Sequence, residues 1–502
     1  KKVRSVATKE RCRPSIPVHR FARTLSTTAY HSRRTIEKAS YPAVILSRSS
    51  TDKSDIHVYS GSEFQRFTFL DRARSPVYAD QKDGPTSLNY ARGMGSSLNA
   101  TTRRQSSLSV RPFSTDSRSD EASSMSTLLV RSKPDFSSAK PIATPLFQTG
   151  AFESGDPYFY TRASNPNFED VEELFTRMDG GAIGSVLLSS GMATIAGVLS
   201  SLKTGDRVVA NTLLYGCSVR FLKDYCASRG IRLDFVDLSC ESSRAAGLAS
   251  SQPNLVFVET PTNPFLRSIP ISALAAEAKS YVPNCQIVVD NTWATPLFQR
   301  PLELGADVAI YSCSKFFSGH SDLILGVASC READALESFK RQRFYHGAVP
   351  DPFAAWLLRR SMQTLELRME KHMSSTSQVV DFLESESHHH VEEVFMPHVD
   401  GEQLSGYGGL LFFKMKNDED GSKADRFADA LSLFDRGTPM ATVRSAVAIP
   451  YTGSHASMTP DEKEQIGLGK DIVRLSVGIE NPSDLILDLR RAFGIIQSKP
   501  KP

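Results

Sequence analysis

The 502-residue sequence has no Cys-x-x-Cys pair, no pair of histidines at zinc-ligand spacing and no long apolar run. Its cysteines are seven scattered residues: Cys12, Cys217, Cys226, Cys240, Cys285, Cys313 and Cys330. An odd number without paired spacing argues against a disulfide framework and against a structural metal. Every apolar run is far shorter than the roughly 20 residues that a membrane-spanning helix needs, and a net charge of +3 indicates no nucleic-acid partner. We therefore expect a protein of a reducing compartment with no metal, no nucleic acid and no membrane span.

One histidine run could suggest a metal site. His388, His389 and His390 are consecutive, but they lie among Glu386, Ser387 and Glu392 in a polar stretch. A short polar tract of this kind is typical of a solvated loop, and we interpret it so.

The first 124 residues differ in composition from the rest. The first 50 carry twelve Lys and Arg residues against only Glu10 and Glu37, and they are rich in Ser and Thr. Arg-rich, acid-poor composition resembles an organelle presequence, so we expect a disordered extension over residues 1–124 that addresses a mitochondrion or plastid. A merely disordered extension of a cytoplasmic protein is the alternative. Because the sequence begins with Lys1 and not with Met, we expect the true start to be missing.

From about Met125 short apolar runs alternate with helical patterns. Residues 185–190, 207–211, 233–238, 254–260, 286–292 and 307–313 are predicted to be buried strands, and residues 191–202, 218–230 and 271–282 helices between them. This alternation predicts an α/β fold with a mostly parallel sheet covered by helices on both faces, which binds ligands at the carboxyl ends of its strands. A long helical stretch over residues 353–385 precedes predicted strands at 408–416 and 472–480, which indicate a smaller C-terminal α+β domain.

Two charged residues follow neighbouring predicted strands. Lys315 comes just after the strand that ends in "AIYSC", and Asp290 ends the strand "QIVVD". A carboxylate at the end of an apolar strand is costly unless it meets a cation or hydrogen-bond donors, and a protonated heterocyclic nitrogen would satisfy it. Taken singly, each residue is more often a solvated lysine or a turn aspartate.

A third element is "SSGMAT", Ser189 to Thr194, which turns from a strand into a helix. Gly191 allows close backbone approach, and the N–H groups of Gly191 and Met192 at a helix N-terminus suit a phosphate. Hydroxyls of Ser312 and Ser314 could complete this cradle. An ordinary helix cap is the alternative for "SGMA" alone.

Together these elements provide an amine, an acid for a pyridinium and a phosphate cradle. They match the three handles of pyridoxal phosphate: the aldehyde on Lys315, the ring nitrogen on Asp290 and the phosphate at the helix N-terminus. We therefore predict pyridoxal 5'-phosphate as the cofactor and Lys315 as its Schiff-base lysine.

From about Ser126 to Phe493 the chain resembles the Cys/Met-metabolism pyridoxal-phosphate enzymes. The segments that carry the resemblance include "TPLFQTGAF", "YFYTRASNP", "LSSGMATI", "VETPTNP", "VVDNTWATP", "DVAIYSCSKFFSGHSD" and "VRLSVGIENPSDLILDL". The resemblance implies a fold type I transferase-like architecture and a homo-oligomer with shared active sites. It assigns residues 125–180 to an arm that contributes to the neighbouring subunit's site, 181–375 to the cofactor-binding domain and 376–502 to the C-terminal α+β domain.

Five further residues take roles from this resemblance. Tyr160 and Arg162 match a pair that binds the cofactor phosphate of the neighbouring subunit. The resemblance implies that Tyr215 stacks on the cofactor ring and is, with Lys315, a catalytic candidate. It also implies that Asn263 bonds the ring oxygen and that Arg474 binds the substrate α-carboxylate. Alternatives from the residues themselves are a salt bridge for Arg162, a half-buried aromatic for Tyr215 and a turn former for Asn263. Arg474 lies inside an apolar strand and needs a buried partner, which a ligand carboxylate would supply.

The family's usual Ser-(Leu/Phe/Trp)-Gly segment is changed here. Pro439, Met440 and Ala441 occupy it, so the serine that normally touches the substrate arginine is absent. Thr438 replaces the Glu that precedes this segment in the γ-synthase and γ-lyase of cystathionine, and a threonine cannot hold a distal ammonium as a carboxylate would.

The resemblance favours one reaction among several. "STLLVRSKPDF", "PIATPLFQT" and "IPYTGSHASMTP" look most like plant-type cystathionine β-lyase, whereas Cys217 in "YGCS" resembles methionine γ-lyase or is only a small buried residue. We expect β-elimination of cystathionine to homocysteine, pyruvate and ammonia, a step of methionine synthesis, with an amino acid as the substrate. The alternatives are a methionine or cystathionine γ-lyase, a cystathionine γ-synthase or homoserine-ester sulfhydrylase, and a descendant that binds the cofactor without turnover.

Overall fold

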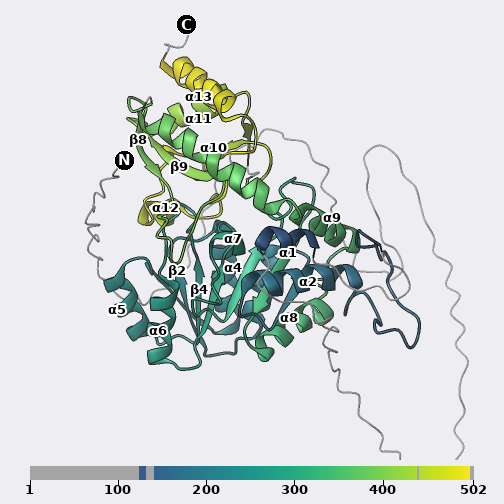
Figure 1. Cartoon of the computed structure of the whole chain (residues 1–502). Coiled ribbons are helices and arrows are strands. Elements are labelled where there is room, and N and C mark those ends of the chain that lie inside the picture. Colours follow the sequence, from purple (N-terminus) through teal and green to yellow (C-terminus); the bar gives the residue numbers. More distant parts are fainter. Residues whose placement is uncertain (1–123, 132–140, 386, 438–439, 498–502) are drawn as a thin grey trace, which may run out of the picture. The chain divides into compact units, whose positions relative to one another are not determined.

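The computed structural model describes residues 124–131, 141–385, 387–437 and 440–497 (Figure 1). The predicted organelle address, Thr438 and Pro439 lie outside these ranges. The helices are α1 (Met125–Arg131), α2 (Pro166–Asp179), α3 (Gly191–Ser200), α4 (Gly216–Arg229), α5 (Glu241–Ser251), α6 (Ile271–Tyr281), α7 (Thr295–Phe298), α8 (Ala333–Tyr345), α9 (Pro352–Met362), α10 (Leu365–Ser385), α11 (Ser422–Ala430), α12 (Pro460–Gln465) and α13 (Pro482–Gln497). The strands are β1 (Gly184–Leu188), β2 (Arg207–Asn211), β3 (Arg232–Val236), β4 (Leu255–Glu259), β5 (Gln286–Asp290), β6 (Val308–Ser312), β7 (Gly326–Cys330), β8 (Val391–Phe395), β9 (Leu410–Met415), β10 (Asp435–Arg436), β11 (Ala446–Ala448) and β12 (Ile472–Ser476).

The larger sheet has the order β1-β7-β6-β5-β4-β2-β3 among the described residues. The strands β6, β5, β4, β2 and β3 pair in parallel, while β7 runs antiparallel to both β1 and β6. The predicted mostly parallel sheet is confirmed, and the antiparallel strand β7 is an addition to it.

Helices cover both faces of this sheet because alternate residues of each strand point to opposite sides. Val209, Val256 and Val289 pack with apolar residues of α2, α6 and α9 in one cluster. Val208, Phe257 and Ile310 pack with residues of α3, α4 and α8 in another. Both clusters are fully buried, which holds the strand ends, and hence any side chains that follow them, in fixed places.

A second sheet has the order β10-β11-β12-β9-β8 within the described chain. It is antiparallel apart from the β10–β11 pair, and it forms a third apolar cluster with α10, α11 and α13 (Figure 1). The predicted helical stretch over residues 353–385 is two helices, α9 and α10, which are interrupted at Gln363 and Thr364. The smaller C-terminal α+β part predicted from the sequence is therefore present.

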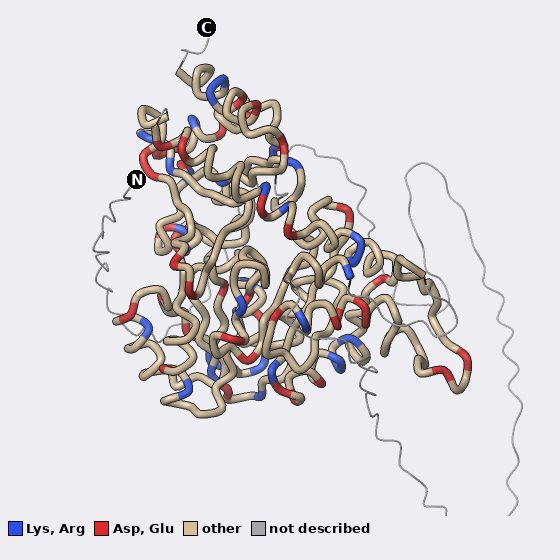
Figure 2. The backbone as a smooth tube through the Cα atoms, viewed as in Figure 1, with Lys and Arg blue, Asp and Glu red and all other residues tan. Residues whose placement is uncertain are grey.

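The remaining structural expectations concern charge and membranes. Lys and Arg residues are interspersed with Asp and Glu residues over most of the coloured backbone in Figure 2. The run His388 to His390 forms a turn in which His388 and His389 are exposed, as expected for a solvated loop. Within the described ranges, none of the helices combines the length and the apolar character that crossing a membrane requires.

Candidate active site

Lys315 lies in a turn that directly follows β6. Its N–H donates to Ser312 O at 3.2 Å, and its carbonyl accepts from Gly319 N at 2.8 Å. The amine is half-buried, and its pKa is lowered to about 8, first by burial and then by the positive charge of Arg474, against a smaller raising effect of Asp290. A lysine with this pKa is partly neutral near pH 7 to 8, which is the form that acts as a nucleophile or base.

Asp290 ends β5, one strand away from Lys315. Its Oδ1 accepts from the Thr292 N–H at 3.1 Å and from the Thr292 hydroxyl at 2.6 Å. The same hydroxyl accepts from Ser312 N at 2.9 Å, so Thr292 ties the ends of β5 and β6 together. Burial raises the pKa of Asp290 to about 6, although the bonds from Thr292 and the charge of Lys315 act in the opposite direction. A cationic ring nitrogen would offset this burial cost.

The turn before α3 matches the predicted phosphate cradle in its backbone. Ser190 caps the helix by accepting from Ala193 N at 3.0 Å. In the described part of the chain the N–H groups of Gly191 and Met192 have no acceptor, as is usual for the first residues of a helix. These two donors, at the positive end of the helix dipole, suit an anion.

Close packing holds this turn against β6 and β7. A Cβ on Gly191 would lie 3.0 Å from the Cβ and 3.2 Å from the Oγ of Ser312, so the Ser312 hydroxyl borders the cradle. A Cβ on Gly326, the first residue of β7, would lie 2.4 Å from Ser190 O and 2.7 Å from Gly191 N. Gly326 is thus required for the turn to sit where it does, and sequence reasoning missed it.

The other predicted hydroxyl has a local partner. Ser314 Oγ accepts from Leu325 N at 3.2 Å, which ties the Lys315 turn to the segment that leads into β7. The Ser314 hydroxyl therefore supports the turn, and the nearer hydroxyl to Gly191 is that of Ser312.

Tyr215 precedes α4 and is held by a carboxylate that sequence reasoning overlooked. Its N–H donates to Glu259 Oε2 at 2.8 Å, and Glu259 Oε1 accepts from Trp293 Nε1 at 2.6 Å. Glu259 is buried and pairs with Asp290 across β4 and β5; burial and the charge of Asp290 raise its pKa well above the ordinary value. Burial, together with a hydrogen bond to Cys217, raises the pKa of Tyr215 to about 12. Glu259 ends an apolar strand as Asp290 does, so the same signal could have found it.

Two further predicted residues are buried with polar atoms that have no partner in the described structure. Asn263 is 1% exposed and both its Oδ1 and Nδ2 lack a hydrogen bond, and Arg474 is 2% exposed and lacks partners at Nη1 and Nη2. Burial lowers the pKa of Arg474 to about 10. Unsatisfied buried polar groups are rare in folded proteins and call for a reason, and a bound ligand is such a reason.

Tyr160 and Arg162 are not brought to this site within one chain. Both are exposed, and the Arg162 guanidinium lies 5.3 Å from the Tyr160 ring and 4.8 Å from the ring of Phe344 in α8. A role in their own chain's site is therefore not supported by the contacts of the described residues. Cys217 is also exposed, so the alternative interpretation of a small buried residue at this position is wrong.

The changed segment before β11 is described from Met440 onward. Met440 and Ala441 are buried, and the Ala441 N–H donates to Ser476 Oγ at 2.8 Å. Ala441 has a φ of 61°, in the left-handed region that favours the glycine expected at this position. Thr438 and Pro439 are not described, so the predictions on them stay predictions.

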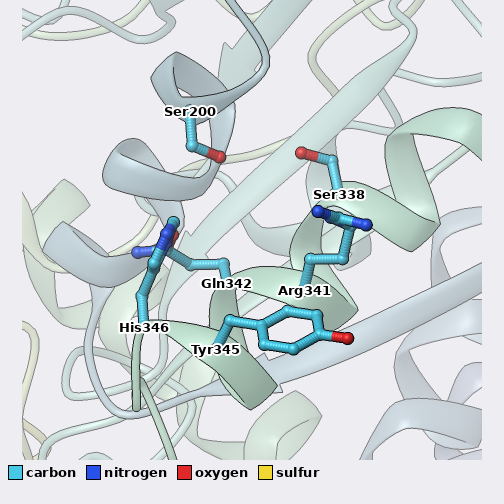
Figure 3. Close-up of a pocket in the computed structure, with 6 residues that line it drawn as sticks. All are labelled: Ser200, Ser338, Arg341, Gln342, Tyr345 and His346. Carbon is cyan, nitrogen blue, oxygen red and sulfur yellow. The ribbon is translucent and has the colours of Figure 1, made fainter.

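A separate hollow of about 310 Å³ lies between α3 and α8 (Figure 3). Ser200, Ser338, Arg341, Gln342, Tyr345 and His346 line it. The set contains none of the residues that the sequence predicts for the cofactor or the substrate, so this hollow is distinct from the site around Lys315.

The residues around Lys315 fit pyridoxal phosphate. Lys315 offers an amine of lowered pKa, Asp290 a buried carboxylate for a ring nitrogen, and the start of α3 two unpaired N–H donors for a phosphate. Asn263 and Arg474 offer unpartnered polar atoms, which a ring oxygen and a carboxylate would satisfy.

Comparisons with known proteins agree with this fit. The sequence profile of the family described as "Cys/Met metabolism PLP-dependent enzyme" matches residues 126–494. The chain is 32% identical over 365 residues to the cystathionine β-lyase of Lactococcus lactis subsp. cremoris (strain MG1363), covering 70% of this chain and 94% of that one. It is 35% identical over 354 residues to the L-methionine γ-lyase of Pseudomonas deceptionensis, covering 68% and 86%.

The fold is also that of solved relatives. The crystal structure of cystathionine γ-synthase from Xanthomonas oryzae pv. oryzae, in complex with aminoacrylate and cysteine, superposes with a TM-score of 0.71 at 29% identity and covers 75% of this chain and 99% of that one. It shares the α/β architecture of fold type I pyridoxal-phosphate enzymes. The chain therefore belongs to the Cys/Met metabolism PLP-dependent enzymes, a family of pyridoxal-phosphate enzymes of carbon–sulfur cleavage and trans-sulfuration.

Proposed function

We propose that the protein catalyses β-elimination of L-cystathionine, which with water yields homocysteine, pyruvate and ammonia. The observation that supports an amino-acid substrate is the buried guanidinium of Arg474, whose Nη atoms have no partner. Its positive charge contributes to the lowered pKa of Lys315, and Tyr215 acts in turn on the pKa of Arg474. A substrate α-carboxylate on Arg474 would place the α-carbon near the amine that removes its proton.

Lys315, Arg474 and Tyr215 would have separate roles in this elimination. When bound, pyridoxal phosphate withdraws electrons from the α-carbon, which makes its proton removable and lets a sulfur on the β-carbon leave. Lys315, with its pKa of about 8, takes the α-proton at Nζ. Arg474 orients the substrate through its planar fork of donors. The Tyr215 ring would stack on the bound cofactor, and its phenol stays protonated at neutral pH because its pKa is about 12.

The choice of β- over γ-elimination rests on sequence. Thr438 replaces the acidic residue expected in the γ-enzymes of cystathionine, and cystathionine β-lyases are among the relatives. The second candidate is methionine γ-lyase, because exposed Cys217 contacts Tyr215 and a relative at 35% identity has that activity. A synthase or sulfhydrylase and a protein without turnover are further candidates.

Product analysis separates these candidates. Purified protein loaded with pyridoxal phosphate is given L-cystathionine, and the oxo acids and thiols are identified by mass spectrometry. Pyruvate with homocysteine is the expected result, and Lys315→Ala should release neither. Cysteine with 2-oxobutyrate, or faster release of methanethiol from methionine, would overturn the proposal. Cystathionine formed from a homoserine ester and cysteine would indicate the synthase.

We further propose that the site is shared between subunits. Tyr160 and Arg162 are exposed, and the ring contacts of Arg162 are with Tyr160 and Phe344, so they would be free to serve the phosphate of a neighbouring subunit. Lys315→Ala and Arg162→Ala subunits, each inactive alone, should regain part of the activity when refolded together. If the mixture stays inactive while refolded wild-type protein recovers, the sharing is refuted.

A further inference from the structure

His455 lies in the loop between β11 and α12 and is fully buried. Its Nε2 is 3.2 Å from Leu214 O and 3.3 Å from Asn263 O. Both partners are carbonyl oxygens, which only accept, so Nε2 carries the proton and donates to both. The Nδ1 atom is 3.0 Å from Ser454 Oγ, and the hydroxyl donates to it. The neutral ring is thus satisfied at both nitrogens.

The ring remains neutral at physiological pH. Burial lowers the pKa of His455 to about 4, and the positive charges of Arg474 and Lys463 act in the same direction, while the two carbonyls oppose them. A neutral imidazole with a fixed tautomer is a rigid donor, because the second nitrogen sets which one holds the proton.

The carbonyl of Leu214 belongs to the same peptide unit as the N–H of Tyr215. That N–H donates to Glu259 at 2.8 Å, while the oxygen accepts from His455. The peptide plane that precedes the Tyr215 side chain is therefore held at both ends by buried groups. The second His455 bond holds the backbone carbonyl of Asn263, whose side-chain amide has no partner in the described structure.

Backbone packing fixes His455 against the same turn. A Cβ on Gly216, the first residue of α4, would lie 2.6 Å from Ser454 O and 3.1 Å from His455 Cα. The loop backbone thus touches the α4 backbone with no side chain between them. The position of the His455 ring relative to Tyr215 is consequently set by main-chain contact.

We propose that His455 is a positioning residue that fixes, from the C-terminal part of the chain, the two segments that present Tyr215 and Asn263 to the cofactor. The inference rests on the roles proposed above for Tyr215 and Asn263. Arg474 lies on β12, which pairs with β11, and the loop of His455 follows β11, so the C-terminal part of the chain would both hold the cofactor contacts and supply the substrate arginine.

The test compares His455→Met with His455→Gln in the full-length protein. Methionine has a similar volume and no donor, whereas glutamine places an N–H donor close to the position of Nε2. We expect His455→Met to weaken pyridoxal-phosphate binding about tenfold or more, as the loss of one to two hydrogen bonds predicts, and His455→Gln to restore it to within about threefold. In the cofactor-free protein, amide hydrogen exchange over residues 212–216 and 262–266 should accelerate in His455→Met and return toward the wild-type rate in His455→Gln.

His372→Met is the matched control. His372 is equally buried and its Nδ1 bonds Val477 O at 2.8 Å, whereas the Leu214 and Asn263 carbonyls are bonded by His455. This control should leave exchange in the two segments unchanged. If His455→Met lowers only the melting temperature, with exchange and cofactor affinity as in wild type, the positioning role is refuted. If His455→Met does not fold, His455→Asn against His455→Gln repeats the comparison, because asparagine is too short to reach either carbonyl.

The exchange measurement needs no cofactor, which separates this inference from the proposed function. If the wild-type protein failed to bind pyridoxal phosphate, the cofactor-binding roles proposed for Tyr215 and Asn263 would be refuted. If hydrogen exchange is unchanged in His455→Met while the wild-type protein binds the cofactor normally, only the positioning role of His455 is refuted.

Discussion

Replacing Arg474 by methionine should make the cofactor-free protein more stable while it removes activity. Arg474 is 2% exposed, and its Nη atoms have no partner in the described structure. Its pKa is lowered to about 10 by burial. Compared with an ordinary value of about 12 or above, and at roughly 1.4 kcal/mol for each pKa unit, keeping this group charged costs the folded state about 3 kcal/mol. The cost is present at pH 7, because the unfolded arginine is also charged there and suffers no burial.

Methionine fills a similar volume without a charge to bury. We expect Arg474→Met to raise the free energy of unfolding of the cofactor-free protein by about 1–3 kcal/mol, measured by urea denaturation followed by circular dichroism. The same variant should lower kcat/KM for cystathionine by about 100-fold or more, because a charge-assisted pair with the substrate carboxylate is lost. Arg474→Lys keeps the charge but not the fork, and should show the loss of activity without the gain of stability.

A second buried arginine provides the opposite case. Arg359 donates to Asp170 Oδ1 at 3.0 Å and to Leu129 O at 3.0 Å. Arg359→Met leaves the buried Asp170 carboxylate without its cation and should lower stability by about 3 kcal/mol or more. If Arg359→Met and Arg474→Met destabilise the protein equally, or if Arg474→Met retains activity, the inference that Arg474 binds a ligand carboxylate is refuted.

Two further substitutions test buried groups near the sheet. Burial raises the pKa of Asp179 to about 7, so the folded protein keeps this proton while the unfolded chain loses it above pH 4, and stability falls as the pH rises from about 4 to 7. The gain in unfolding free energy from Asp179→Asn should therefore grow from near zero at pH 4 to about 4 kcal/mol above pH 7. A gain that does not depend on pH would contradict this prediction. Gly326→Ala should weaken cofactor binding and lower stability by about 1–3 kcal/mol, because the new Cβ meets the Ser190 and Gly191 backbone. Its control, Gly494→Ala in α13, has open space around it and should raise stability by about 0.5–1 kcal/mol.

The strand-end argument explains why the candidate site could be predicted from the sequence. Lys315 and Asp290 follow apolar runs, and parallel strands place their carboxyl ends at one edge, so their proximity follows from periodicity alone. Glu259 ends the adjacent strand and carries the same signal as Asp290, but its hydrogen bonds to Tyr215 and Trp293 join residues that are distant in the sequence. The roles of Thr292 and Gly326 could not be predicted from the sequence, because they depend on packing distances that no local pattern encodes.

The strand β7 and the loop of His455 could not be predicted from local signals. β7 is the short segment "GVASC", in which Val327 is the one β-branched residue beside Gly, Ala, Ser and Cys, so it is recognised as a strand only through its pairing with β1 and β6. His455 is near Tyr215 in space but 240 positions away in the sequence (455 − 215). Such contacts arise from tertiary packing alone.

The antiparallel pairing of β7 has a consequence for synthesis on the ribosome. In the described sheet β1 pairs with β7 alone, and Leu188 is opposite Gly326, 138 residues later (326 − 188). At roughly 5–20 residues per second, β1 leaves the ribosome about 7–28 s before its partner is made. During this interval an apolar strand has an open edge, which is a template for pairing with other chains. We therefore expect nascent chains that stop between β1 and β7 to depend on chaperones, and chains that extend past Cys330 to depend on them less.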